Sequence, residues 1–353
     1  MRIAILSRNK NLHSIRRLLK EARELKVHCD VIDPLDCQLI VDGAQTRLLN
    51  GAKVVPDYDV VLPRIGASIT DYGLAVVRQF EVQGTFVINS SRAIAESRDK
   101  MRSLQILASS GIRVPASVLT RHMAGLKKAF VHLKGMPVVM KVIQGTQGVG
   151  VMLVNTPISL ASVWESMQGL GQDVILQQFI SEGAGRDFRA FVVGNRVVAA
   201  MMRTATAGEF RSNIHQGGEG TLITLPRIYQ QVALKAARVL GLEIAGVDIM
   251  QSHDGPLVLE VNSSPGFEGI EKATGLNIAK AILKHMIAKS RENRRSRRGQ
   301  YASSLWDGLE KGTGQLKVER KKTTKKAAKK ISKKKPLKAR KSVPSKKVSK
   351  KKV

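Results

Sequence analysis

The chain has 353 residues, 43% of them hydrophobic, which is enough to build the cores of two or three domains. Its formal net charge is +31, and much of it lies at the C-terminal end, because residues 317–353 contain 19 Lys or Arg and a single acidic residue. The two cysteines, Cys29 and Cys37, lack the CxxC or Cys/His spacing of a zinc site. The opening MRIAILSRNK is too short and too charged for a signal peptide, and no apolar run is long enough to cross a bilayer. We therefore expect a cytoplasmic protein with no membrane partner.

Residues 1–95 alternate short apolar runs with helical patterns. The runs are RIAILS, VHCDVID, DVVLPRIG and TFVINS, and helical periodicity covers residues 11–25 and the segment YGLAVVRQFEVQG. Strands that alternate with helices are typical of a parallel sheet. We predict a small N-terminal α/β domain.

Two further units are predicted, over residues 96–175 and 176–288. In the first, a helix over 93–111 precedes the strand IRVPASVLT, two strands flank a glycine-rich loop in PVVMKVIQGTQGVGVMLV, and ISLASVWESM forms a helix. The strand DVILQQFI spans the boundary between the two units. In the second, the strands DFRAFVVG and RVVAAMMRTA come before a helix over 227–240, a β-hairpin and a last helix over 276–288.

Residues 289–353 have a different composition, beginning with RENRRSRRGQ and ending in a lysine-rich segment. A segment with low hydrophobicity and high charge cannot bury enough apolar surface to offset the entropy of ordering, so we predict a basic disordered tail. Residues 317–353 contain no aromatic residue, so they can neutralise phosphates but have little means of stacking on bases. The alternative is a solubilising extension without a partner.

The predicted hairpin carries three oxygen-bearing side chains. Side chains alternate across a strand, so Glu260 and Asn262 in VLEVN share one face. A three-residue loop over 253–255 would place Asp248 directly opposite Glu260. Facing carboxylates are destabilising unless a cation offsets them, and oxygen ligands suit magnesium. The sequence therefore indicates a metal site at Asp248, Glu260 and Asn262, and the alternative is a solvated strand face.

The loop QGTQGVG contains Gly145, Gly148 and Gly150, and Lys141 lies four residues before the first of them. Glycines allow backbone amides to approach phosphate oxygens closely, and a lysine adds a point charge. The spacing matches neither a Walker loop nor a Rossmann fingerprint. A phosphate-binding loop and an ordinary hairpin tip are both compatible with it.

Arg203, Arg211 and Asn213 lie in the glycine-punctuated segment MMRTATAGEFRSNIHQGGEG. Guanidinium groups bind phosphate or carboxylate in a bidentate manner, although a solvated loop also contains arginines. The dipeptide of Asp99 and Lys100 and the segment RDFR are weaker signals when taken alone.

Taken together and in order, these segments resemble the ATP-grasp ligases. The resemblance rests on SRDKMRSLQILASSGI, MKVIQGTQGVGV, LQQFI, RDFRAFVVG, FRSNIHQGG, AGVDIM and LEVNSSPGFEGIEKATG. LPRIGASITDYG followed by RQFE narrows it to the RimK family, which adds glutamate to the C-terminal carboxylate of small-subunit ribosomal protein six. The similarity covers about residues 1–288. It implies an α/β ATP-grasp fold preceded by a small Rossmann-like domain, with the disordered Lys-rich tail outside it.

The resemblance implies roles for the matching residues, with ATP and magnesium, or alternatively manganese, as cofactors. Catalysis would involve Arg203, Arg211 and Asn213. The magnesium ligands would be Asp248, Glu260 and Asn262. ATP would be bound by Lys100 and Lys141 below a flap with Gly145 and Gly148, by the hinge at Gln178 and Phe179, by Asp187 at the ribose, and by Arg211, Ser212 and Asn213 near the transferred phosphate.

Two positions depart from the family pattern. Gln178 stands where the hinge usually has a Glu, so backbone groups would carry adenine recognition. Met202 replaces an acidic residue that is often found beside Arg203. Neither change removes an expected metal ligand or phosphate contact.

The resemblance further implies that ATP converts the acceptor carboxylate to an acyl phosphate, which the amino group of L-glutamate then attacks. It also implies a homo-oligomer, namely a tetramer. With a ribosomal acceptor, the basic tail would contact ribosomal RNA. Two alternatives stay open: an ATP-grasp ligase for another acid or carrier protein in cofactor or amino-acid biosynthesis, and a ribosome- or nucleic-acid-binding protein with an inactive ATP-grasp fold.

Overall fold

The computed structural model describes residues 1–122, 125, 130–143, 150–206, 209–210, 212 and 218–310, with side-chain surroundings as far as residue 296. Met1–Arg295 form one compact unit. Within the described ranges, no helix combines the length and the apolar character needed to cross a membrane.

The N-terminal domain contains the predicted parallel sheet. Its strands are β1 (Arg2–Leu6), β2 (His28–Ile32) and β6 (Val60–Pro63), in the order β2-β1-β6, with helices α1 (His13–Glu24), α2 (Thr70–Val82) and α3 (Ser91–Arg98). The central strand β1 is buried from Ile3 to Leu6 because it packs against apolar side chains on both faces. The expected small α/β domain is confirmed.

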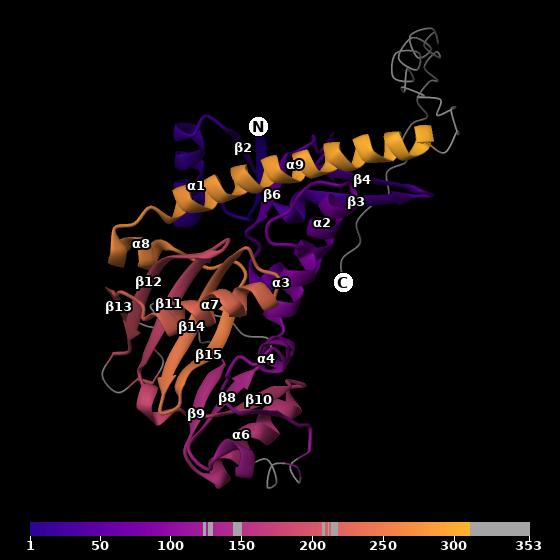
Figure 1. The fold of residues 1–353 in the computed structure, drawn as a ribbon. Helices are drawn as coiled ribbons and strands as arrows, with labels where there is room; N and C mark the ends of the chain where they lie inside the picture. Colours follow the sequence, from indigo (N-terminus) through magenta and orange to yellow (C-terminus); the bar gives the residue numbers. More distant parts are fainter. Residues whose placement is uncertain are drawn as a thin grey trace, which may run out of the picture. The chain divides into compact units, whose positions relative to one another are not determined.

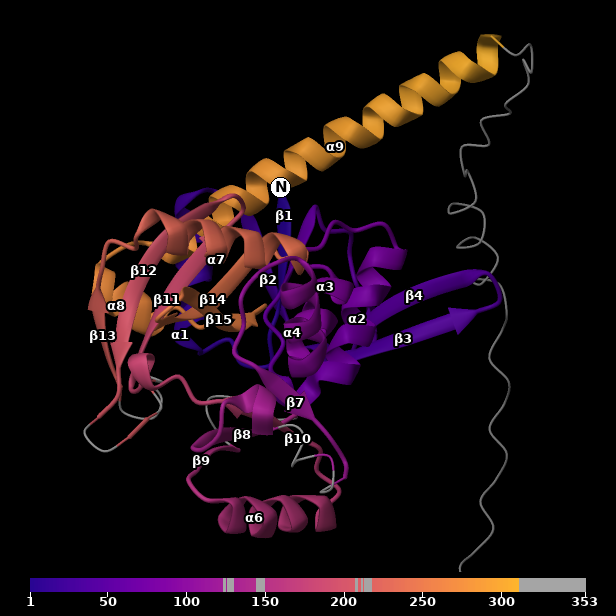
Figure 2. The same cartoon turned by 60° about the horizontal axis from the view of Figure 1, so that its bottom comes forward.

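A second, antiparallel sheet in this domain was not predicted. It consists of β3 (Cys37–Asp42), β4 (Gln45–Asn50) and β5 (Lys53–Val54). Strands β3 and β4 pack beside α2 (Figure 2). The β3–β4 turn places Gly43 at φ 56°, the left-handed conformation that glycine adopts without strain.

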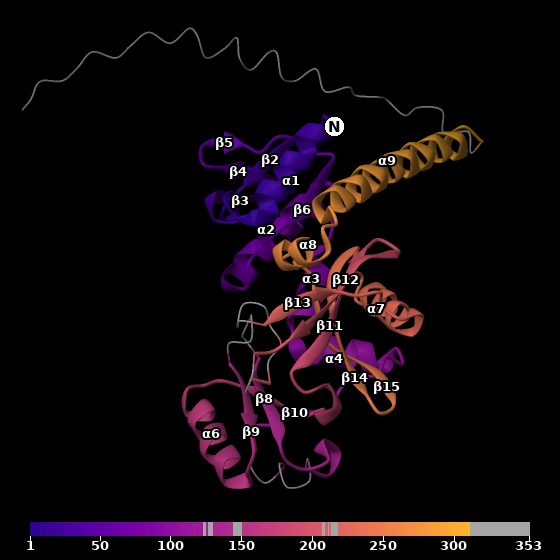
Figure 3. The same cartoon turned by 90° about the vertical axis from the view of Figure 1, so that its left-hand side faces the viewer.

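The central part of the chain forms a four-stranded antiparallel sheet in the order β7-β10-β8-β9. Helix α6 covers one face, where Leu160 and Trp164 pack against Val138 and Met140 (Figure 3). Lys141, between two residues of that face, therefore projects from the opposite face. The elements are α4 (Lys100–Ser109), β7 (Ser117–Leu119), β8 (Val138–Val142), β9 (Val151–Val154), α6 (Pro157–Gly169) and β10 (Val174–Gln178).

The single helix predicted over residues 93–111 is wrong, because Asp99 divides it into α3 and α4. Asp99 adopts an extended conformation, and its carboxylate accepts a hydrogen bond from the backbone N–H of Arg102. An Asp in this role caps a new helix instead of continuing the old one. The break puts Lys100 in the first turn of α4.

The C-terminal sheet is antiparallel, in the order β13-β12-β11-β14-β15. Helix α7 covers one face (Figure 1). On the other face, Phe191, Met201 and Ile244 belong to a core that also includes residues of α8 and α9. The elements are β11 (Arg186–Val193), β12 (Arg196–Thr204), β13 (Glu219–Leu222), α7 (Arg227–Val239), β14 (Ile244–Ser252), β15 (Gly255–Asn262), α8 (Glu268–Thr274) and α9 (Ile278–Glu310).

The β14–β15 hairpin confirms that Asp248 faces Glu260, but not through the expected loop. Ser252 pairs with Gly255, so the turn has two residues and not three. The register then shifts between Asp248 and Ile249, where a bulge leaves Leu259 as the extra residue. The bulge compensates for the shorter turn and restores the predicted pairing.

Helix α9 continues past residue 288, where the last helix was expected to end, as far as Glu310. The predicted start of the tail at residue 289 therefore falls inside a helix. The segment KSRENRRSRR is polar but contains neither proline nor glycine, and Arg, Lys and Glu favour helix formation. Residues 311–353, most of the predicted tail, lie outside the described residues.

Candidate active site

One face of the C-terminal sheet changes from apolar to charged along its strands. On β11, Phe191 lies in the core and Arg189 and Asp187 follow at alternate positions on the same face. Register places Asp187 opposite Arg203 of β12 and Arg189 opposite Asp248 of β14. Three adjacent strands, β12, β11 and β14, thus bring alternating charges together at one end of the sheet.

The two arginines hold the two aspartates in a continuous network. Arg189 donates from Nε and Nη2 to the two carboxylate oxygens of Asp248, each at 2.5 Å. Arg203 donates from Nε to Asp187 Oδ1 at 2.7 Å and from Nη2 to Oδ2. The same Nη2 lies 2.9 Å from Asp248 Oδ2, so Arg203 joins both carboxylates.

Burial and charge act in opposite directions on these groups. Burial alone would raise the pKa of Asp248, but Arg189 and Arg203 outweigh it and lower that pKa to about 2. For Asp187, burial prevails over the attraction of Arg203 and raises the pKa. The pKa of Arg203 is raised, because the two aspartates outweigh the effect of its burial. Asp248 is therefore an anion at neutral pH.

Glu260 and Asn262 extend the charged face onto β15. The Glu260 side chain is about half exposed, and its Oε1 accepts a hydrogen bond from Asn262 Nδ2 at 2.8 Å and lies 4.0 Å from Arg189 Nη2. Asn262 is paired with Gly246, two residues before Asp248. Two carboxylates and one amide thus lie together on the hairpin.

This donor set fits a hard divalent cation. Within the described residues, no group of three His, Cys, Asp or Glu side chains is placed to hold a metal. Asn262 offers an amide oxygen beside the two carboxylates. On Asp248, Oδ2 already has two partners, Arg189 and Arg203, whereas Oδ1 accepts from Arg189 alone and keeps a lone pair for a cation.

Two lysines from different elements complete the cluster. Lys141 projects from β8, and burial lowers its pKa while Glu260 and Asp248 act to raise it. Lys100 donates from Nζ to the carbonyl oxygens of Val142 and Ile143 at 3.0 and 2.8 Å. Burial also lowers the pKa of Lys100, with Glu260 opposing. Cations from α4 and β8 thus act on the carboxylates of β14 and β15.

The predicted hinge lies at the end of β10. The backbone N–H of Gln178 donates to the carbonyl of Ala116 at 2.8 Å, so a backbone contact to adenine would have to come from another group of the hinge. Gln177 is buried and donates from Nε2 to Ser117 Oγ at 2.9 Å. The side chains of Gln178 and Phe179 are partly exposed.

Comparison with known families identifies the family of this chain. Residues 97–286 match the model of the RimK-like ATP-grasp domain, and residues 1–94 match the RimK PreATP-grasp domain. The chain belongs to the RimK family. The predicted family, the ATP-grasp fold and the ligase class are confirmed.

Bacterial relatives of similar length support this assignment. A protein from Saccharophagus degradans named probable alpha-L-glutamate ligase is 47% identical over 300 residues, covering 85% of this chain and 99% of the relative. A protein of the same name from Shewanella loihica is 49% identical over 300 residues, with the same coverage.

Solved structures share the fold at lower identity. A RimK domain protein from Sphaerobacter thermophilus is 23% identical, with a TM-score of 0.63, covering 81% of this chain and 99% of that chain. The D-alanine–D-alanine ligase of Bacillus anthracis, complexed with ATP, is 20% identical, with a TM-score of 0.62, covering 84% and 99%. The ligase PsnB, complexed with a minimal precursor, Mg and ADP, is 19% identical, with a TM-score of 0.64, covering 82% and 98%.

Several predicted site residues of this RimK-family chain cannot be placed. Gly145, Gly148, Arg211 and Asn213 lie outside the described residues. Ser212, between two of them, is described and buried. The roles expected for these positions stay predictions.

Arg189 is the residue of this RimK-family site that the sequence analysis missed. The segment RDFR places Asp187 and Arg189 on the same face of one strand, which is the signal that could have revealed it. This pattern identifies Arg189 as a partner of Asp248 only when β11 is known to pair with β14. By the same alternation, Met202 projects away from Arg203 and the charged face, so its departure from the family pattern lies outside the network.

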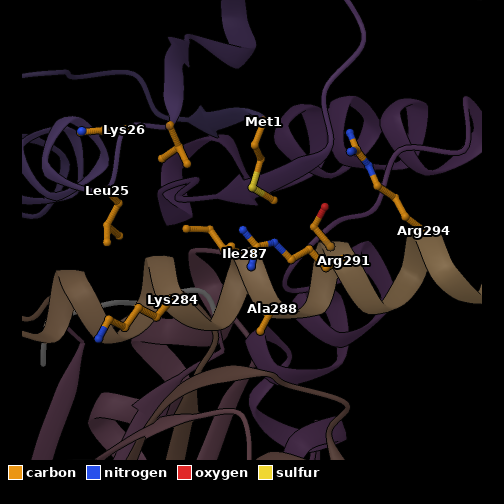
Figure 4. Close-up of a pocket in the computed structure, with 10 residues that line it drawn as sticks. Met1, Leu25, Lys26, Lys284, Ile287, Ala288, Arg291 and Arg294 are labelled. Carbon is orange, nitrogen blue, oxygen red and sulfur yellow. The ribbon is translucent and has the colours of Figure 1, made fainter.

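An open pocket of about 650 Å³ lies apart from the charged cluster of this RimK-family chain, beside the first half of α9 (Figure 4). None of the residues of the charged cluster lines it. Its lining includes four basic residues and no acidic one: Lys26, Lys284, Arg291 and Arg294. These side chains offer matched controls for substitutions in the site.

Proposed function

We propose that the chain is an ATP-dependent ligase that joins L-glutamate to the C-terminal carboxylate of a small-subunit ribosomal protein. One observation carries the proposal. Asp248 lies opposite Glu260, with Asn262 beside them, and these carboxylates interact with the cations of Lys100 and Lys141. The names of the bacterial relatives support glutamate as the amino acid.

The binding roles follow from the chemistry of the side chains. Asp248, Glu260 and Asn262 would hold magnesium, or alternatively manganese, which would neutralise charge on the phosphates of ATP. Lys100 and Lys141 would bind the same phosphates. Asp187 would reach the ribose only through lone pairs that Arg203 leaves unused, since both its oxygens accept from that residue.

The reaction would proceed in two steps. A carboxylate oxygen of the acceptor attacks the terminal phosphorus of ATP, the bond to ADP breaks, and an acyl phosphate forms. The amino nitrogen of glutamate then attacks the acyl carbon, phosphate leaves with the bonding electrons, and the nitrogen loses a proton. Arg203, with Arg211 and Asn213, would stabilise negative charge that develops on the phosphate oxygens. A glycine flap would exclude water from the acyl phosphate.

A peptide acceptor tests this proposal. We expect ADP release to require ATP, magnesium, L-glutamate and a peptide with the acceptor's free C-terminus, and to stop when that C-terminus is amidated. ADP release with the amidated peptide would contradict carboxylate activation at the C-terminus. Turnover with a free small acid and none with the peptide would support a ligase for another acid instead.

The lysine-rich residues 317–353 would contact ribosomal RNA and raise the local concentration of the enzyme at a ribosomal acceptor, which would place the reaction in the cytoplasm. Deletion of these residues should weaken RNA binding and flatten its salt dependence, whose slope is about −0.7 to −0.9 per phosphate neutralised. Equal RNA binding by the full-length and truncated chains at low salt would contradict the tether. The family resemblance also supports a tetramer, which light scattering can test.

A further inference from the structure

Arg64, in the LPRIG motif, lies where the parallel sheet of the N-terminal domain opens. It directly follows β6, and its backbone N–H donates to the carbonyl of Leu6, the last residue of β1. The chain runs from β1 to β2 on one side, and β6 lies on the other side of β1. Ligands of open α/β sheets bind at such a switch point, outside the carboxyl ends of the strands.

The Arg64 guanidinium has neutral partners in the protein. Its Nη2 donates to the carbonyl oxygen of Pro265 at 2.8 Å, and its central carbon lies 5.8 Å from the ring centroid of Phe267. Burial lowers its pKa to about 10. No carboxylate in the described part of the chain forms an ion pair with it.

Arg189 and Arg203 differ from Arg64 in having carboxylate partners. Both of those arginines donate two hydrogen bonds to a buried aspartate, so their charge is compensated within the protein. Arg64 is half-buried, and a cation that loses part of its hydration without gaining an ion pair disfavours the folded state. A guanidinium held in this way is suited to an anion that arrives from solution, and its planar edge fits a carboxylate.

A short series of contacts connects Arg64 with the charged cluster. Its acceptor Pro265 follows Asn262 by three residues, in the loop after β15. A Cβ added to Gly246 would lie 2.8 Å from the Cβ of Pro265 and 3.7 Å from the Cδ of Arg189. Pro265 and Arg189 therefore both close over Gly246, so the residue that Arg64 binds lies beside the residue that holds Asp248.

We propose that Arg64 binds a carboxylate of the incoming amino acid, its α-carboxylate or its side-chain carboxylate. The inference rests on the proposed function, which requires two kinds of carboxylate. The acceptor carboxylate has to reach the transferred phosphate, near Lys100 and Lys141. The carboxylates of glutamate do not react and need a cation elsewhere, and Arg64 offers one on the N-terminal domain.

Steady-state kinetics of Arg64→Met and Arg64→Lys test this role. We expect Arg64→Met to raise KM for glutamate about 10- to 100-fold, the loss typical of a hydrogen-bonded charge, with KM for ATP changed less than about twofold. KM for glutamate in Arg64→Lys should lie between the values of Arg64→Met and the wild type, because lysine keeps the positive charge but cannot donate two parallel hydrogen bonds. Arg291→Met, at the pocket of Figure 4, is the matched control and should leave both constants unchanged.

Thermal unfolding separates binding from a structural role. Without ligand, Arg64→Met should unfold at the wild-type temperature or above it, because it removes an uncompensated charge. A lower unfolding temperature with an unchanged KM for glutamate would overturn the inference, as would a rise in KM for the acceptor alone.

Substrate analogues identify the carboxylate. Glutamine lacks the side-chain carboxylate, and isoglutamine lacks the α-carboxylate. If Arg64 binds the α-carboxylate, Arg64→Met should weaken the binding of glutamine but not of isoglutamine. If Arg64 binds the side-chain carboxylate, the reverse is expected. Equal losses for both would overturn the inference. If the wild type releases no ADP with glutamate, the proposed function fails. Carboxylate binding by Arg64 is then tested with other carboxylate-bearing amino acids. An amino acid that raises the unfolding temperature of the wild type but not of Arg64→Met supports the role, and equal effects on both proteins overturn it.

Discussion

Replacement of Arg189 by Met removes the main partner of a buried carboxylate. Arg189 gives Asp248 two hydrogen bonds at 2.5 Å, whereas Arg203 contributes one contact at 2.9 Å and also binds Asp187. Breaking a buried ion pair by removing one partner costs about 3–5 kcal/mol. Because Arg203 remains as a partner of Asp248, we expect Arg189→Met to lower the free energy of unfolding by the smaller amount, about 3 kcal/mol at neutral pH.

The same pair predicts a pH dependence. The pKa of Asp248 is lowered from 3.8 to about 2, so its contribution to stability is present above pH 4 and is lost as the pH falls toward 2. At 1.36 kcal/mol per unit, that contribution is about 2 kcal/mol. In Arg189→Met the pKa of Asp248 moves back toward its ordinary value or above it, so the variant should lose less stability than the wild type between pH 4 and pH 2.

Urea unfolding at pH 7 and at pH 3 measures both effects. Arg121→Met is the matched control, because Arg121 also makes a bidentate pair with an aspartate, Asp173, but on the exposed surface. Surface pairs contribute little, so this control should unfold close to the wild-type midpoint. If Arg189→Met unfolds at the same urea concentration as Arg121→Met, the buried network does not hold Asp248 as described.

Three further substitutions test the nucleotide and metal assignments. Glu260→Gln should abolish ADP formation with an unchanged unfolding temperature, because it removes one of two ligand charges, and retained magnesium-dependent turnover would refute the assignment. Lys141→Met should weaken the binding of an ATP analogue measured by calorimetry without lowering the stability of the free protein, since burial already disfavours this charge. An unchanged affinity would leave the glycine-rich loop as a simple hairpin tip. Gln178→Glu should change ATP affinity less than about tenfold, or 1.4 kcal/mol, and a larger change would show that the side chain reads the adenine.

The part of the site that the sequence predicted depends on strand periodicity. Alternation alone places Glu260 and Asn262 on one face, and a short turn between two apolar runs brings Asp248 opposite. The turn length was predicted wrongly, yet the pairing was right, because the bulge at Leu259 offsets the missing residue. Such compensation cannot be derived from turn signals, since a bulge depends on the packing of both strands.

Features set by tertiary contacts were not predictable from local patterns. The partnership of Arg189 with Asp248 requires β11 and β14 to be neighbours, although about sixty residues separate them in the chain. The small sheet of β3 to β5 has mostly exposed strands that lack a strong apolar alternation. Helix α9 extends through charged residues because helix formation needs no apolar face where good helix formers follow one another.

Intact-mass spectrometry of the acceptor tests glutamate transfer to a protein C-terminus. Purified small-subunit ribosomal proteins would be incubated with the full-length chain, ATP, magnesium and L-glutamate, with Glu260→Gln as the inactive control. We predict that one protein gains mass in steps of a single glutamate residue, located by fragmentation at its C-terminus, and that the control shows none. ATP-dependent ADP release without any such mass increase would contradict the account.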